Sequence, residues 1–206
     1  MIRAYDSDYL FFARNSLGRM CDFAVYNLGY NLEDFFDLFI KSGLAYKFSR
    51  GDITTINKSG FELALEVLNL NDLDIEIAFS DYSFNRSEEY WLGYYLAYYQ
   101  WYSNLSFEFI IDKVSINELL LMYDKYHEMD IMHFVEYLNK IIFKSNKLKY
   151  YRKKRKLTQK ELAILTNIPL RSIQQYEQDK KDLSKANASY LIALSNVLYC
   201  EVQNLI

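Results

Sequence analysis

The chain has 206 residues, of which 51% are hydrophobic and 25% charged, with a net charge of −3, so it can bury a core and is not disordered. One proline and six glycines are too few for the turns of an all-β sandwich or barrel, and we expect a mainly α protein. No apolar run reaches the ~18 residues of a membrane span and the first residues lack a secretion signal, so we expect a cytoplasmic protein that contacts no membrane.

Helix-start signals recur along the first 146 residues. In chain order they are Asp6 to Asp8 before a heptad pattern ending at Gly29, Asn31 before a stretch ending at Gly43, Ser59 with Glu62, Ser87, Ser115 with Glu118, and Asp130 before 131–143. The two Ser–Glu pairs are capping boxes, in which the hydroxyl and the carboxylate each accept a bond from a free amide. Only residues 73–79 alternate with period two, so they are the one candidate strand.

The stretch 90–102 places large aromatic side chains all along one expected helix, beyond the width of an ordinary apolar stripe. Two interpretations are open. The helix can be a core helix packed on several sides, or part of it can receive a protein partner, because interfaces favour Tyr and Trp. The candidate partner-binding residues are Trp91, Tyr94, Tyr95, Tyr98, Trp101 and Tyr102.

Charge changes sign near residues 144–147. Residues 1–146 hold 12 basic and 22 acidic side chains, a balance of −10, whereas residues 147–206 hold 12 and 5, a balance of +7. We therefore expect an acidic, aromatic-rich helical domain over 1–146 and a basic domain over 147–206. A basic module on an acidic body favours a nucleic-acid partner, although a run of Lys and Arg alone fits a solvated helix face equally well.

The basic domain carries the signals of five short helices. They are expected at residues 149–156, 158–165, 169–177, 186–198 and 201–206. Thr158 and Glu161 form a capping box that opens the second helix. Pro169, the only proline, begins the third helix, where its missing amide hydrogen costs nothing.

These features occur in a familiar order: a basic first helix, Thr158-Gln-Lys-Glu-Leu-Ala163, a turn, Ser172-Ile-Gln-Gln-Tyr-Glu177, a basic loop and a Leu-rich fourth helix. The segment resembles the helix-turn-helix domain of Cro/cI-type repressors, the XRE class. The resemblance implies a five-helix, lambda-repressor-like fold that binds a double-stranded DNA operator as a homodimer, with its third helix in the major groove. A relative that has lost DNA binding is the alternative.

The resemblance also assigns residues to the DNA contact. They are Gln159, Leu170, Arg171, Ser172, Gln174, Gln175, Lys181 and Lys185. Gln159 matches a phosphate-binding position, and Lys181 and Lys185 fall where the loop after the third helix meets phosphates. The base-reading positions match Leu170, Arg171 and Gln175 best: Arg171 can bond guanine, Gln175 can bond adenine, and Leu170 can touch a thymine methyl.

Four other positions in the domain are expected to be scaffold. Arg152 and Glu177 match a structural ion pair of the family. Asn167 and Asp179 stand where many members carry Gly, and both residue types tolerate the left-handed backbone that such turns need.

Short motifs of the front domain resemble a second group, bacterial regulators with a helical front domain and a C-terminal XRE domain. The motifs are Leu17–Met20, Phe35–Phe39 with Ser42-Gly43, Tyr90–Gly93, Tyr98–Tyr102 and His127–Ile131. The group resembles antitoxins encoded beside small toxins. This implies that the front domain binds a protein toxin while the basic domain represses the shared promoter, with the two affinities coupled. A ligand-sensing or plain dimeric repressor without a toxin partner is the alternative.

Residues suited to catalysis are few, and we expect neither an enzyme nor a cofactor nor a bound metal. His127, Asp130 and His133 could share a helix face, but the HExxH pattern is absent, and histidines near a helix start are more often caps. Cys21 lacks a neighbouring His to activate its thiol. A Gly-rich phosphate loop and a GxSxG motif are both missing.

Overall fold

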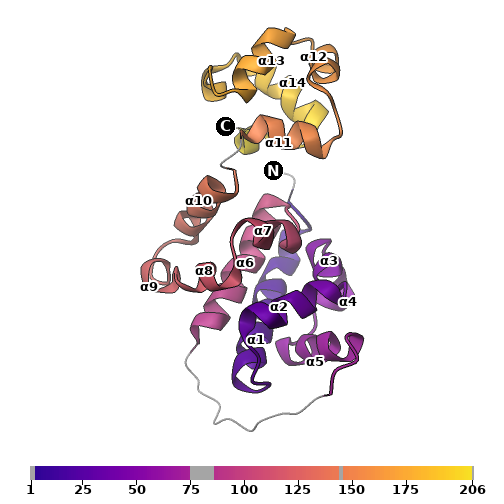
Figure 1. Cartoon of the computed structure of the whole chain (residues 1–206), viewed down its shortest axis with the longest axis vertical. Helices are drawn as coiled ribbons and strands as arrows, with labels where there is room; N and C mark the ends of the chain where they lie inside the picture. Colours follow the sequence, from indigo (N-terminus) through magenta and orange to yellow (C-terminus); the bar gives the residue numbers. More distant parts are fainter. Residues whose placement is uncertain (1–2, 75–85, 144–145, 206) are drawn as a thin grey trace. The chain divides into compact units, whose positions relative to one another are not determined.

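The computed structural model describes residues 3–74, 86–143 and 146–205, and every regular element within these ranges is a helix (Figure 1). This confirms the prediction of a mainly α protein. The expected strand at 73–79 lies mostly outside the described residues, and its first two residues are in no strand. The chain divides into two compact units, Arg3–Leu138 and a second that begins at Asn139. The expected domain boundary after residue 146 falls inside the second unit and stays a prediction.

Over its described residues, the front unit is built from two long helices, α1 and α6, and several shorter ones. They are η1 (Ser7–Tyr9), α1 (Leu10–Tyr26), α2 (Leu32–Lys41), α3 (Leu44–Ser49), α4 (Ile53–Ile56), α5 (Gly60–Leu70), α6 (Glu88–Ser103), α7 (Phe107–Lys113), α8 (Ile116–Leu120), α9 (Tyr123–Tyr126) and α10 (Ile131–Ile142), which runs into the second unit. The predicted caps of α2, α5, α6 and α8 are confirmed, both capping boxes included. The signal at Asp6 caps the short η1 and not α1 itself.

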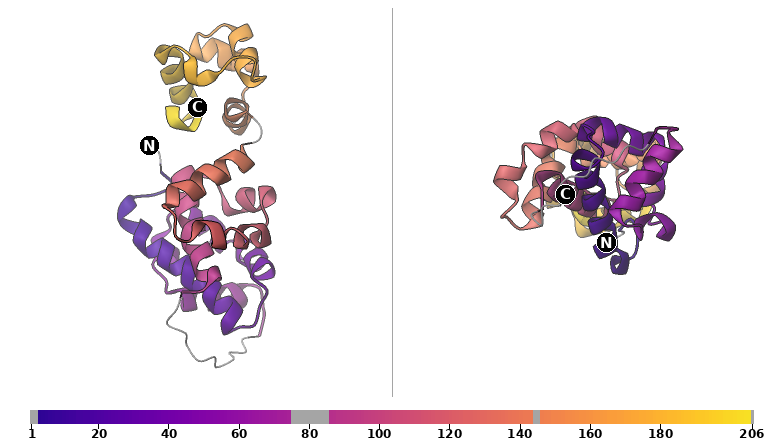
Figure 2. Two further views of the ribbon diagram at one scale, coloured as in Figure 1. Left: turned by 90° about the vertical axis from the view of Figure 1, so that its left-hand side faces the viewer. Right: turned by 90° about the horizontal axis from the view of Figure 1, so that it is seen from below.

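Helices α1 and α6 lie side by side through most of their length, and α5 packs on α1 (Figures 1 and 2). Glycines bring the backbones together. A Cβ atom at Gly93 of α6 would lie 2.6 Å from the carbonyl oxygen of Leu17 and 2.9 Å from Cα of Gly18 on α1. A Cβ atom at Gly60 of α5 would lie 2.4 Å from the main-chain nitrogen of Met20. Only glycine permits such approaches, so these positions fix where the three helices meet.

A second part of the front core consists of phenylalanines from α2, α3 and α7. The rings of Phe36, Phe39, Phe48 and Phe107 are buried, and most of their contacts are edge to face, with centroids 5.4–6.1 Å apart. Such edge contacts contribute about 0.5–1.5 kcal/mol each beyond the burial of area. The aromatic motif of α2 thereby holds its neighbouring helices.

Over residues 146–205 the second unit holds five α-helices, as the sequence predicts. They are α11 (Lys147–Lys154), α12 (Gln159–Thr166), α13 (Leu170–Glu177), α14 (Ala188–Leu198) and α15 (Val202–Leu205), with the 3-10 turn η2 (Leu183–Lys185) before α14. Several helix starts differ from the prediction, and those of α11 and α14 differ because side chains cap at other residues. Asn146 caps α11 so that it begins at Lys147, Pro169 is the N-cap residue of α13, and Asn187 caps α14.

Candidate nucleic-acid interface

The helix-turn-helix is assembled by local signals at both ends of α12. The hydroxyl of Thr158 accepts a bond from the amide of Glu161 at 3.1 Å, and the carboxylate of Glu161 accepts one from the amide of Thr158 at 2.7 Å. Asn167 ends the helix with φ +53°, the left-handed conformation expected for this position. Two residues later, Pro169 precedes the first turn of α13. The turn between the two helices is therefore encoded by the residues that form it.

Helix α13 is held by its inner face. Ile173 is fully buried and Tyr176 nearly so, in a core that includes Leu162 of α12 and Leu194 of α14. Because helical residues repeat every 3.6 positions, burial of this face turns the opposite face outward. The hydrophobic pattern of α13 thus decides which side chains are free to meet a ligand.

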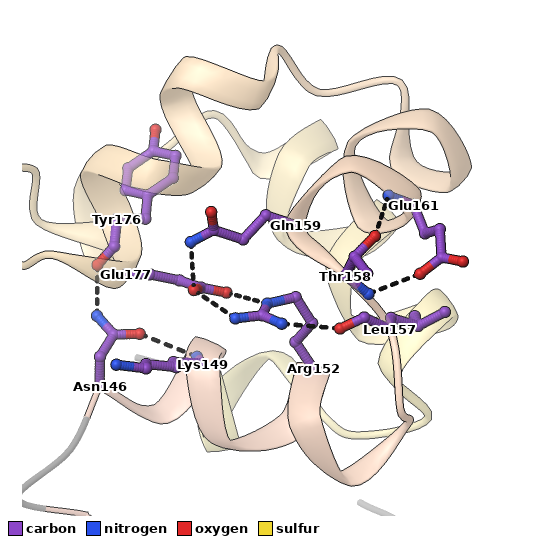
Figure 3. A network of polar contacts seen from close by, with 9 residues as sticks. All are labelled: Asn146, Lys149, Arg152, Leu157, Thr158, Gln159, Glu161, Tyr176 and Glu177. Carbon is purple, nitrogen blue, oxygen red and sulfur yellow. Dashed lines mark hydrogen bonds and ion pairs between the residues drawn. The ribbon is translucent and has the colours of Figure 1, made fainter.

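A buried ion pair joins α11 to α13 (Figure 3). Nε of Arg152 donates to Glu177 at 2.5 Å and Nη2 donates to the second carboxylate oxygen at 2.8 Å. The third guanidinium nitrogen, Nη1, donates to the carbonyl oxygen of Leu157 at 2.7 Å. Bonding to Glu177 raises the pKa of Arg152. The structure confirms this pair as scaffold, because both side chains are buried and satisfied by each other.

Gln159 belongs to the same network. Its Nε2 donates to Glu177 at 2.8 Å, so the side-chain amide at the start of α12 is oriented by the carboxylate at the end of α13. The residue is partly exposed, as a phosphate contact requires. The carboxylate of Glu177 therefore sets the geometry of three helices at one point (Figure 3).

Asn146 is a contributor that the sequence analysis missed. Its Oδ1 accepts a bond from the amide of Lys149 at 3.1 Å and caps α11. Its Nδ2 donates to the carbonyl oxygen of Tyr176, at the end of α13 (Figure 3). The same Nδ2 donates to Asp179 at 2.7 Å. An Asn before a basic helix is a recognisable cap signal, but its bonds to α13 depend on tertiary packing.

The expected base-reading residues lie on the outer part of α13. Arg171 is exposed and Gln175, one turn later, is partly exposed, both on the side opposite Ile173. Leu170, Ser172 and Gln174 flank them and are partly exposed. The structure therefore gathers these five side chains on one short surface, and their contacts with DNA stay a prediction.

The expected phosphate-binding lysines lie in the segment after α13. Lys181 and Lys185 are both exposed. The Nζ of Lys185 is 3.6 Å from a carboxylate oxygen of Asp182, a solvent-exposed pair that contributes little to stability. The left-handed backbone expected at Asp179, which begins this segment, is confirmed by φ +53°.

The six aromatic residues proposed for a partner are not equivalent. Trp91 is only 7% exposed, and its ring packs on Tyr95, Tyr123 and Phe134, so it lies in the core. The other five, Tyr94, Tyr95, Tyr98, Trp101 and Tyr102, are partly exposed. The helix therefore has one face in the core and another that reaches the surface.

The residues considered for catalysis have structural surroundings. His127 stacks on Tyr123 with centroids 4.5 Å apart, and Nδ1 of His133 is 3.3 Å from the carbonyl oxygen of Asp130. Cys21 is fully buried, and burial raises the pKa of its thiol. Over the described ranges, no group of three or more His, Cys, Asp or Glu side chains is arranged to hold a metal ion. None of the helices described is both long and apolar enough to span a membrane.

Comparison with known proteins identifies the second unit. Residues 148–202 match the family model described as helix-turn-helix, which spans α11 to the first residue of α15. No curated protein and no solved structure matches the chain. The protein therefore carries a DNA-binding helix-turn-helix domain of the kind found in XRE-type transcription regulators. The front unit lies outside the matched residues.

Proposed function

We propose that the protein is a repressor that binds a palindromic operator as a homodimer, and that its front unit binds a protein toxin, as an antitoxin does. The observation that carries the DNA-binding part is the placement of α13. Its inner face is locked into the core while Arg171 and Gln175 point outward one turn apart. A helix held in this way presents a fixed set of side chains to the major groove.

Base recognition follows from the chemistry of these side chains. The guanidinium of Arg171 can donate two bonds to O6 and N7 of one guanine, and the amide of Gln175 can bond N6 and N7 of an adenine. Leu170 offers only apolar atoms and fits a thymine methyl group. Ser172 and Gln174 flank this strip and can bond bases or phosphates.

The lysines and Gln159 supply affinity that does not depend on sequence. Lys181 and Lys185 can each neutralise a phosphate, and Gln159 lies at the start of α12, where free amides favour an anion. Because each neutralised phosphate releases counterions, affinity for any duplex should fall steeply with salt. The network around Glu177 keeps this helix start at a fixed distance from α13.

The antitoxin part rests on the resemblance of the front unit's motifs and on its surface. The front unit is compact by itself, and the DNA-binding unit follows it in the chain. This arrangement suits a protein whose operator affinity responds to a partner. The toxin would then change the affinity for the operator by the same factor by which the operator changes the affinity for the toxin. A plain dimeric repressor, or one that senses a small ligand, would show no such protein-dependent change.

Selection of operator sequences from random duplex DNA with the full chain tests the proposal. We expect enrichment of a palindrome whose half-sites lie about one helical turn apart, protected together in a footprint. Enrichment of no sequence, with equal affinity for all duplexes, would contradict sequence-specific binding. A single protected half-site at saturating protein would contradict the homodimer.

A further inference from the structure

Arginines cover the partly exposed aromatic face of α6. We name this surface the arginine–tyrosine face, and its members are Arg3, Arg14, Tyr94, Tyr98, Trp101 and Tyr102. The tyrosines come from successive turns of α6, whereas the two arginines come from α1 and from the segment before it. The surface therefore exists only in the folded unit.

Both guanidinium groups are held in fixed positions. Cζ of Arg14 is 3.7 Å from the ring centroid of Tyr94 and 5.1 Å from that of Tyr98, and its Nε donates to the carbonyl oxygen of Tyr94 at 3.3 Å. Cζ of Arg3 is 3.9 Å from the centroid of Tyr102, and its Nη1 donates to the carbonyl oxygen of the same residue at 2.8 Å. Each arginine is thus stacked on a ring and tethered to the main chain.

Among the residues that the structure describes, no carboxylate neutralises the charge of these two arginines. Within the described part of the chain, Arg3 and Arg14 bond to main-chain oxygens and contact rings, and neither forms an ion pair. A guanidinium keeps its proton even when it is partly buried. The face is therefore a fixed positive surface on a unit whose sequence is strongly acidic.

We infer that the arginine–tyrosine face docks a short acidic segment of a protein partner, whose carboxylates bond the free edges of Arg3 and Arg14. A stacked guanidinium presents a planar pair of N–H groups that matches a carboxylate. Because the side chain is already held in place, binding costs little further side-chain conformational entropy. Phe11, on the same side of α1 one turn before Arg14, is 65% exposed and offers an apolar contact beside the charges. Arg, Tyr and Trp are also the residues that dominate binding energy at protein interfaces.

A nucleic acid fits this surface less well. Bases stack on open aromatic faces, but the rings of Tyr94 and Tyr102 are covered by guanidinium groups at 3.7 and 3.9 Å. A long polyanion would also extend beyond the two arginines over an acidic unit, which repels it. A short acidic segment of a protein avoids both difficulties.

The inference rests on the partner-binding part of the proposed function and names the chemistry of the partner. The net charge of the front domain would suggest a basic partner surface. The local charge at the exposed aromatic residues is the opposite, so the segment that docks there carries carboxylates.

The test uses the full chain and a short fluorescein-labelled peptide of alternating glutamate and glycine, followed by fluorescence anisotropy. The double variant Arg3→Gln/Arg14→Gln should bind the peptide about ten-fold more weakly, a change of about 1.4 kcal/mol. Two double variants with the same charge change serve as controls: Lys41→Gln/Lys47→Gln on the exposed front surface and Lys149→Gln/Lys153→Gln on α11. Both should bind within about two-fold of the unaltered chain, a difference near 0.4 kcal/mol.

Equal losses in all three variants, or a loss confined to the α11 variant, would overturn the inference, because the peptide would then follow net charge or bind the DNA-binding unit. Full affinity in Arg14→Lys would overturn the role given to the planar guanidinium. Binding of poly(dT) that only the arginine variant loses, with peptide binding unchanged, would overturn it in favour of a nucleic acid.

Operator affinity, measured on the same proteins, separates the two hypotheses. The arginine variant should keep its operator affinity, because its changes lie in the front unit. If the arginine variant loses peptide affinity and the controls do not, but the unaltered chain binds no operator, the repressor hypothesis is refuted and the docking face stands. If the unaltered chain binds the operator but the arginine variant and the controls bind the peptide equally well, only the docking face is refuted.

Discussion

Removal of the Glu177 carboxylate should be the most damaging single change in the DNA-binding unit. Glu177→Ala leaves Arg152 buried, at 8% exposure, without the two bonds of 2.5 and 2.8 Å that satisfy it. It also releases the amide of Gln159. Loss of one partner of a buried ion pair costs about 3–5 kcal/mol, because the remaining charge stays out of water.

That magnitude is large against the whole stability of a domain, which is about 5–15 kcal/mol. We therefore expect Glu177→Ala to lower the midpoint of urea denaturation sharply, measured by far-ultraviolet circular dichroism, and to weaken DNA binding through partial unfolding. Glu161→Ala is the matched control, since it also removes one carboxylate from the same unit. That residue is exposed and serves only the capping box, so the loss should be about 0.5–2 kcal/mol.

A double variant gives a second reading of the same pair. Arg152→Met/Glu177→Leu replaces both charges by apolar side chains, and such exchanges are often neutral or stabilising. It should therefore recover most of the stability that Glu177→Ala loses. Denaturation midpoints of Glu177→Ala and Glu161→Ala that coincide would refute the argument, because the buried pair would then contribute no more than a surface cap.

Four further outcomes are expected. Arg171→Ala should cost about 1–3 kcal/mol on the selected operator and relax specificity at one base pair, and an unchanged affinity in a gel-shift titration would remove this residue from the interface. Lys185→Ala should weaken operator and random duplex equally and reduce the salt slope by about one, so a loss that depends on sequence would exclude a phosphate contact. Gly93→Ala should destabilise the front unit by about 1–3 kcal/mol or more in thermal melting, because a Cβ there meets main-chain atoms at 2.6 Å, and an unshifted melting temperature would contradict that packing. Burial raises the pKa of Tyr150 to about 12, so its contribution to stability is complete below pH 10 and is lost as pH rises toward 12; phenolate absorbance of this residue appearing at its ordinary pH in the folded protein would contradict its burial.

Features that depend on neighbours in sequence could be predicted. The capping boxes at Ser59, Ser115 and Thr158 follow from residues three positions apart, and the structure forms all three. The left-handed backbone at Asn167 follows from the turn that it must make. The pairing of Arg152 with Glu177, 25 positions apart, required the resemblance to a known domain.

Features that depend on tertiary packing could not be predicted. The aromatic pattern of 90–102 did not reveal that Trp91 faces the core while Tyr94 reaches the surface, because aromatic residues occupy both sides of the helix. The approach of Arg3 to Tyr102 joins residues 99 positions apart, and no local signal carries it. The bonds of Asn146 to the end of α13 are hidden in the same way.

The phosphate contacts proposed for the second unit use lysine, whereas the docking face proposed for the front unit uses stacked arginine. The arginines described in the front unit, at positions 3, 14, 19, 50 and 86, all have Cζ within 6.0 Å of an aromatic centroid. In the second unit, lysines such as Lys181 and Lys185 stand exposed, where a hydrated point charge suits an extended phosphate backbone. A stacked guanidinium suits a small anion of defined geometry instead. If both proposals hold, DNA and an acidic partner bind one chain without competing, because the front domain, with a charge balance of −10, repels the polyanion that the basic domain attracts.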